Sequence, residues 1–159
     1  MSLALYCRPV IRERLPCLSF EGRAVLDALL LQEGSIGGAK EVAQRLGLPN
    51  RFRLAQLLRA NGLPPLHRLS AWIMTLAWIW RWESCRIPLS ESALRMRKEP
   101  SAASRLVKRL TGESWTDVRA YGADWMLARL LDECGDVNRQ RFRRKKSGEV
   151  VLAALKRQA

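Results

Sequence analysis

The chain has 159 residues and carries 28 Lys and Arg against 15 Asp and Glu, a formal net charge of +13. Its length suits one domain or two small subdomains that share a helix, and an apolar fraction of 48% argues against disorder over the first 135 residues. So large a positive charge favours a polyanionic partner, usually nucleic acid, over a basic protein that is merely soluble.

Residues 1–37 are predicted to form an N-terminal helical extension. A helix is expected over 21–32, with a broad apolar face made by Ala24, Val25, Ala28, Leu29 and Leu31. Gly34, Gly37 and Gly38 then break the chain. The first residues lack a basic n-region, so no signal peptide is expected and a cytoplasmic, nucleoid-associated location follows.

Residues 38–65 are predicted to form a first helix-turn-helix. A short amphipathic helix over 39–46 is followed by a turn at 47–50 and a second helix over 51–61. Gly62 follows that helix, where glycine commonly ends one. The segment Leu63-Pro64-Pro65 is then a stiff connector to the next element.

Residues 66–85 are predicted to form one long linker helix that holds four tryptophans and is apolar nearly all round. Such a helix is expected to be a central core helix buried against more than one neighbour, the alternative being a membrane or cofactor surface. Its most apolar run, over 69–82, is too short to span a bilayer, so no membrane partner is expected.

Residues 86–122 are predicted to repeat the first pattern as a second helix-turn-helix. A short helix over 89–96 leads into a turn at 97–99, and Pro100 begins a longer helix that Thr111-Gly112 ends. A further helix is expected to begin near Ser114. Residues 123–159 complete the chain as a C-terminal helix and a basic tail.

The basic tail is defined by residues 139–146, of which six in eight are Arg or Lys. Such a run suits the neutralisation of phosphates, and Arg141, Arg143 and Arg144 are predicted to contact DNA. A solvated tail with no specific role is the alternative.

The same unit therefore occurs twice, about 50 residues apart: a short helix, a tight turn, a longer basic helix and a glycine stop. The segments AKEVAQRLGL and LAQLLRANGLPP resemble the first helix-turn-helix of the AraC/XylS family's tandem DNA-binding domain. The segments ESALRM and PSAASRLVKRLTGESWTDVRAYG resemble the second. The matching residues of that second half are Pro100, Ser101, Ser104, Arg105, Val107, Lys108, Arg109, Thr111, Gly112, Ser114 and Tyr121.

The resemblance covers roughly residues 38–122 and implies an all-α fold, with two helix-turn-helix subdomains joined by a long central linker helix. It also implies a bacterial, sequence-specific transcription regulator whose two recognition helices enter adjacent major-groove segments of double-stranded DNA. One monomer would then bind an asymmetric site, without an obligate dimer. The predicted DNA-binding residues on the two recognition helices are Arg51, Arg53, Gln56, Arg59, Ser101, Ala102, Arg105, Lys108 and Arg109.

The second turn departs from the family pattern. Where the family usually has a glycine and an aromatic residue, this chain has Arg97 and Lys98, and the turn is one residue shorter. Because glycine reaches positive φ at little steric cost, Arg97 would be strained in that conformation, which favours a rebuilt turn.

Little in the sequence points to catalysis or to a bound metal. The four cysteines are widely spaced in the sequence: Cys7, Cys17, Cys85 and Cys134. With His67 as the only histidine, they make a poor set of zinc ligands, and the cysteines are expected to be free thiols. No paired-carboxylate pattern or glycine-rich phosphate loop is present, so neither an enzyme nor a cofactor is predicted.

Two alternatives to specific DNA binding remain open at this point. The first is a partner-binding protein that keeps a degenerate helix-turn-helix fold and contacts RNA polymerase or another regulator, for which Trp82, Trp115 and Trp125 are candidate exposed residues. The second is non-specific nucleic-acid packaging driven by charge.

Overall fold

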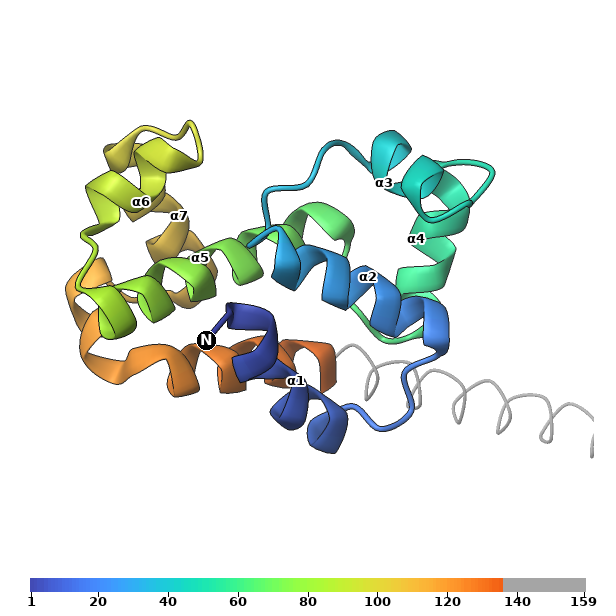
Figure 1. The fold of residues 1–159 in the computed structure, drawn as a ribbon, viewed down its shortest axis with the longest axis horizontal. Helices are drawn as coiled ribbons and strands as arrows, with labels where there is room; N and C mark the ends of the chain where they lie inside the picture. Colours follow the sequence, from blue (N-terminus) through green and yellow to red (C-terminus); the bar gives the residue numbers. More distant parts are fainter. Residues whose placement is uncertain (136–159) are drawn as a thin grey trace, which may run out of the picture.

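The computed structural model describes residues 1–135, and within that range the chain forms helices and no strands (Figure 1). The all-helical class is therefore confirmed. Predicted contacts from Arg141, Arg143 and Arg144 lie outside the described residues. The helices are α1 (Leu3–Arg14), α2 (Phe20–Leu31), α3 (Ala39–Arg45), α4 (Arg51–Ala60), α5 (Leu66–Cys85), α6 (Leu89–Arg95) and α7 (Pro100–Thr111). Residues 115–135 form one more helix, called here the C-terminal helix.

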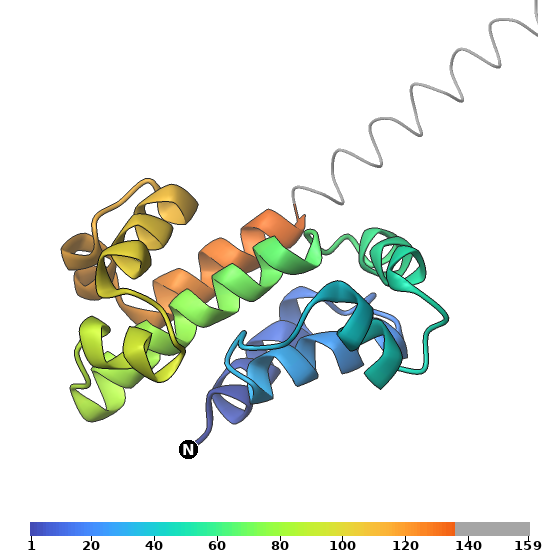
Figure 2. The same cartoon turned by 90° about the horizontal axis from the view of Figure 1, so that it is seen from above.

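Helix α5 is the centre of the fold. Every residue from Trp72 to Ile79 is buried, and the Trp78 side chain is 0% exposed. Helices α2, α6 and α7 pack against α5, and the C-terminal helix runs beside it (Figure 2). A helix that is apolar on every side needs neighbours on every side. Helix α5 has such neighbours, as expected for a central core helix.

The C-terminal helix lies antiparallel to α5. Arg68, near the start of α5, pairs with Glu133, and Glu83, near the end of α5, accepts a hydrogen bond of 3.1 Å from the backbone N–H of Ala123. Gly122 has a φ of +89° within this helix, which interrupts its regular backbone. After this interruption the helix continues from Ala123, and the Glu83 carboxylate lies at the N-terminus of that continued part. The N-terminus of a helix favours negative charge.

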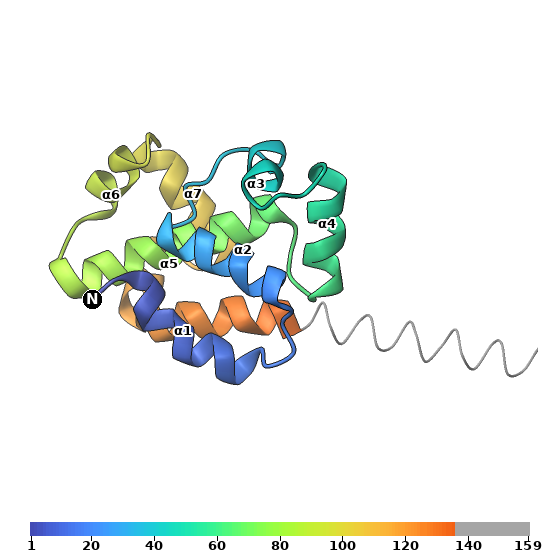
Figure 3. The ribbon, with the colours of Figure 1, turned by 45° about the vertical axis from the view of Figure 1, so that its right-hand side comes forward.

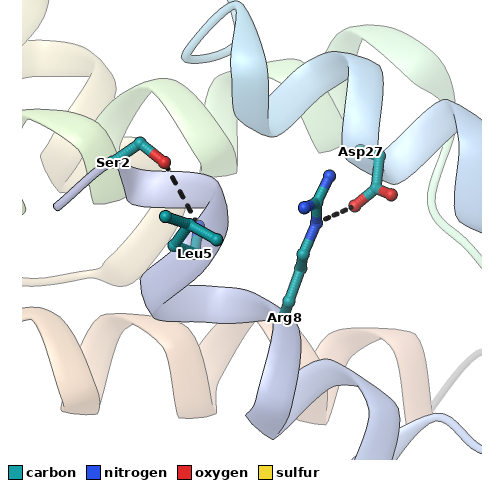
Figure 4. Close-up of polar contacts among 4 residues, drawn as sticks. All are labelled: Ser2, Leu5, Arg8 and Asp27. Carbon is teal, nitrogen blue, oxygen red and sulfur yellow. Dashed lines mark hydrogen bonds and ion pairs between the residues drawn. The ribbon is translucent and has the colours of Figure 1, made fainter.

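Helix α1 is held between α2 and the C-terminal helix. Ser2 caps its first turn, and the Nε of Arg8 lies 3.1 Å from the Oδ1 of Asp27 in α2 (Figure 4). On the other side, Tyr6 donates a hydrogen bond to Asp124, and Arg14 pairs with Asp132 at 2.9 Å. Burial and the bond to Asp124 raise the pKa of the Tyr6 hydroxyl above its ordinary value, so it remains a donor.

One side chain of α2 differs from the sequence-based expectation. Leu31 is 61% exposed, whereas Leu26 and Leu30 are buried. The buried stripe of α2 is Gly22, Val25, Leu26, Leu29 and Leu30, a spacing of three and four residues. Leu31 stands about 100° around the helix from Leu30 and falls outside that stripe.

The four cysteines are free, with Cys7 and Cys134 buried and Cys17 and Cys85 exposed. Desolvation by burial raises the pKa of the Cys7 and Cys134 thiols from 9.0 to about 12. Both thiols thus favour the folded state below pH 9, and this contribution is lost as the pH rises from about 9 towards 12.

We expect a thiol reagent at pH 8 to modify Cys17 and Cys85 quickly in the native protein. Cys7 and Cys134 should react only after denaturation, because they are neither accessible nor ionised. Counting modified sites by mass spectrometry checks this. Rapid native modification of Cys7 would contradict the packing of α1 described above.

Candidate nucleic-acid interface

The pairs α3–α4 and α6–α7 are two versions of one local structure. The bounds of α6 are those of α3 shifted by 50 residues. The ion pair Glu41–Arg45 in α3 recurs as Glu91–Arg95 in α6, each at 2.6 Å. The second helix of each pair has a buried pair of residues four apart, Leu54 and Leu58 in α4 and Ala103 and Val107 in α7, and α7 also buries Thr111. The internal repeat inferred from the sequence is thus present as two matching helix pairs.

The two turns share their backbone geometry. After α3, Gly47 has a φ of +69° and the N–H of Leu48 reaches back 2.8 Å to the carbonyl of Ala43. After α6, Arg97 has a φ of +55° and the N–H of Lys98 reaches back 2.9 Å to the carbonyl of Ala93. This is the Schellman arrangement that satisfies the last carbonyls of a helix.

The expectation of a rebuilt second turn is therefore wrong. The second turn, residues 96–99, is one residue shorter than the first turn, residues 46–50. The difference in length lies after the residue with positive φ, which is Gly47 in the first turn and Arg97 in the second. Arg97 adopts the left-handed conformation because the helix end requires it. A residue with a Cβ pays about 1–2 kcal/mol to do so.

Replacing Arg97 with glycine is expected to raise the free energy of unfolding by about 1 kcal/mol, because glycine adopts this φ without the Cβ clash. Urea denaturation followed by circular dichroism measures the change. Arg97→Ala is the matched control: it removes the same guanidinium but keeps the Cβ, so it should bring no such gain. Equal gains in both variants would mean that the charge, and not the backbone, is the source.

Helix α4 presents a basic exposed face. Asn50 caps its N-terminus, with its side-chain oxygen 3.0 Å from the backbone nitrogens of both Phe52 and Arg53. The four residues predicted here as DNA contacts are all exposed: Arg51, Arg53, Gln56 and Arg59. The Arg53 guanidinium donates to the Gln56 side-chain oxygen at 3.1 Å, which links two of them.

Phe52 is a further candidate that the sequence analysis missed. Its side chain is 64% exposed on α4, and the Arg51 guanidinium lies 5.1 Å from its ring centre. The burial of Leu54 and Leu58 could have revealed it, since that spacing turns position 52 outward. An exposed aromatic ring next to arginines suits apolar contact with a thymine methyl group.

Helix α7 presents the equivalent face of the second pair. Ser101, Arg105, Lys108 and Arg109 are exposed, while Ala102 is half-buried. Ser104 donates its hydroxyl back to the carbonyl of Pro100 at 3.2 Å, so that side chain is bound to its own helix. The polar residues predicted on α7 therefore share its outer face, and Ala102 stands at the edge of that face.

Charge is polarised across the molecule. Residues 51–60 hold three basic and no acidic side chains, and residues 100–111 likewise hold three and none. Residues 3–14 and 115–135 together hold five acidic and five basic side chains, so their charges balance. Both helix pairs stand on one side of α5, at its opposite ends, and α1 and the C-terminal helix lie on the other side (Figures 1 and 3). The positive potential thus gathers on the side of the two repeated helix pairs.

The tryptophans suggested for partner binding are only partly accessible. Trp82, Trp115 and Trp125 are each half-buried, which corrects their expected exposure. Arginine guanidinium groups lie over two of the rings. The guanidinium carbons of Arg119 and Arg86 lie 4.6 Å and 5.6 Å from the ring centre of Trp82. That of Arg129 lies 5.6 Å from the ring centre of Trp125. These stacks combine cationic and aromatic surface at the junction of α5 and the C-terminal helix.

Within residues 1–135, no three or more His, Cys, Asp or Glu side chains are grouped closely enough to hold a metal ion. None of the described helices is both long and apolar enough to cross a bilayer. Comparison with protein-family models, with curated proteins and with solved structures found no match to this chain. The features of this chain that bear on its function are the exposure, the charge and the repetition of α3–α4 and α6–α7.

Proposed function

We propose that this protein is a sequence-specific, double-stranded DNA-binding transcription regulator, with α3–α4 and α6–α7 acting as two helix-turn-helix units. The observation that carries the proposal is the repetition: two helix pairs of matching geometry, each with an acid-free basic outer helix, on one side of a shared core helix. Charge alone fits any polyanion, but two matched outer helices fit two successive stretches of major groove.

The length of α5 supports this arrangement. A helix of 20 residues is about 30 Å long, close to the roughly 34 Å that separates equivalent major-groove segments on one face of DNA. The second pair packs against α5, and the first pair packs against α2 and is joined to the beginning of α5 by the connector 63–65. Helix α5 therefore lies between the two pairs. A monomer would then cover an asymmetric two-part site, as the resemblance to the AraC/XylS family implies.

On this proposal the exposed side chains divide into two roles. Arg53 and Arg105 are suited to bidentate pairing with guanine, and Gln56 to adenine. Lys108 suits phosphate, which positions the protein without reading sequence. The protein would act on the nucleoid, where RNA polymerase is a natural partner of a regulator.

The decisive test is selection of the purified full chain on a random duplex DNA library at about 150 mM salt with excess non-specific competitor. A motif of two boxes, with centres about one helical turn apart, is the expected result. A single box would limit base reading to one helix pair. Binding at low salt without any enriched motif would contradict a specific regulator and favour charge-driven packaging.

The arginine–tryptophan stacks support a second candidate function, binding of a protein partner. Arginine and tryptophan are the residues most enriched among those that dominate protein interfaces. Arg86, Arg119 and Trp82 lie together at the end of α5. If library selection yields no motif, substitution of Trp82 combined with a pull-down using RNA polymerase subunits tests this alternative.

A further inference from the structure

A cavity of about 730 Å³ lies in the first helix pair, between α4 and the beginning of α5. One wall is Leu54, Ala55 and Leu58 of α4, and the opposite wall is the connector 63–65 with the first residues of α5. Residues 36–39, which lead into α3, close a third side. Its volume falls within the roughly 300–1,000 Å³ typical of sites for small organic ligands.

The walls of this cavity are preformed. Leu54, Leu58 and Leu63 are almost fully buried, so the core fixes their positions. Pro64 and Pro65 hold the connector in an extended conformation, because each proline ring fixes its own φ. The cavity is thus a feature of packed elements and not of a single loop.

The side chains that line the cavity include two arginines, Arg51 and Arg59, and no Asp or Glu of the described chain. The carboxylate of Glu41 lies beside Gly37 on the third side, away from the α4 wall that carries both arginines. Arg51 belongs to α4 and His67 to α5, so cationic and imidazole nitrogens border the apolar space from two walls. A neutral apolar molecule would leave the arginine side of this rim unused, whereas an anion would complement it.

We infer that this cavity binds a small organic acid with an apolar body. The hydrocarbon portion would lie against the accessible apolar side chains of the lining, Ile36, Ala55, Pro65 and Leu66. The anionic group would contact Arg51 and His67 at the rim. Apolar burial then provides most of the affinity, and the charge-assisted contact selects anions over neutral analogues.

The site also offers a route to regulation, which rests on the proposed function. Arg51 belongs both to the cavity rim and to the exposed face of α4. An anion held by Arg51 would withdraw that guanidinium from DNA, so the ligand and DNA are expected to weaken each other's binding.

Direct binding is tested with anilinonaphthalenesulfonate, which joins an apolar ring system to an anion and fluoresces when it leaves water. Phenylnaphthylamine has a similar ring body without the sulfonate and serves as the neutral probe. We expect saturable binding of one sulfonate probe per chain, with the neutral probe about tenfold weaker. No saturable binding, or equal affinity for the two probes, would overturn the inference.

Two pairs of variants locate the site. Arg51→Gln should weaken the sulfonate probe about tenfold and leave the neutral probe unchanged, whereas Arg53→Gln, two residues along the same helix, should change neither. Ala55→Trp should fill the cavity and remove binding of both probes, whereas Gln56→Trp should not. Circular dichroism shows whether each variant is folded. If Ala55→Trp is unfolded, the comparison of Arg51→Gln with Arg53→Gln alone tests the location of the site.

DNA is absent from these measurements, so failure of the binding site and failure of the proposed function are distinguishable. Loss of probe selectivity with an intact DNA motif would overturn the inference alone. An Arg53→Gln effect equal to that of Arg51→Gln would overturn it too, because it would show attraction by the whole basic face and not by the cavity.

Discussion

Replacing Gly34 with alanine is expected to lower the free energy of unfolding by about 3 kcal/mol. Gly34 has a φ of +79°, which costs a residue with a Cβ about 1–2 kcal/mol. A Cβ at this position would also lie 2.5 Å from the carbonyl oxygen of Ser70 and 2.7 Å from the backbone nitrogen of Met74. Both are backbone atoms of α5, so neither can rotate away as a flexible side chain would.

The strain from this substitution falls on a junction between α2 and α5. The hydroxyl of Ser70 donates 2.5 Å to the carbonyl of Gly34, and the neighbouring Glu33 pairs with Arg81 of α5. These contacts fix the end of α2 against the core helix just before the chain enters α3. Displacing Gly34 therefore disturbs the ion pair and the hydrogen bond together.

Thermal or urea denaturation followed by circular dichroism measures the effect. A loss of about 3 kcal/mol corresponds to a fall in Tm of roughly 6–12 °C for a chain of this size. Gly38→Ala is the matched control, because Gly38 has a φ of −61° and nothing within 4 Å of an added Cβ. Its effect should stay below about 1 kcal/mol. Equal effects of the two substitutions would contradict the close approach of α2 and α5 at Gly34.

Local signals explain why most helices could be predicted from the sequence. The expected linker helix over 66–85 is α5, Leu66–Cys85, because its apolar residues recur without interruption and prolines precede it. Pro100 and Gly112 mark the two ends of α7 as their conformational preferences require. The exposed polar positions of α4 and α7 follow from the same periodicity, since the buried positions fix which face turns outward.

The features that could not be predicted depend on distant parts of the chain. Glycine at positions 34 and 122 can be read from the sequence as a possible interruption of a helix. Why glycine is needed there depends on α5, because the Ser70 backbone lies close to Gly34 and the Glu83 carboxylate lies close to Gly122. Arg97 takes a glycine-like φ because the helix pair around it is formed, against its own preference. The cavity likewise arises because α4 and the start of α5 border a space that neither fills, which no local pattern encodes.

Replacing Arg105 with glutamine is expected to weaken binding to the selected DNA site about thirtyfold, because a bidentate arginine–guanine contact contributes about 1–3 kcal/mol. Preference at one base position of the second box should be lost with it. Lys108→Gln should instead weaken all duplexes equally and lower the slope of log affinity against log salt by about one unit, the signature of one phosphate contact. Fluorescence anisotropy across a salt series measures both.

Arg12→Gln is the control for both substitutions, since it removes one charge from an exposed position on α1, on the other side of α5 (Figure 1). All three variants have the same net charge, so long-range attraction to DNA changes equally. If binding depends on the outer face of α7, Arg12→Gln should differ from the parent protein by less than about twofold. If instead Arg12, Lys108 and Arg105 contribute equally and no base preference changes, affinity follows total charge, and the protein would package DNA without reading its sequence.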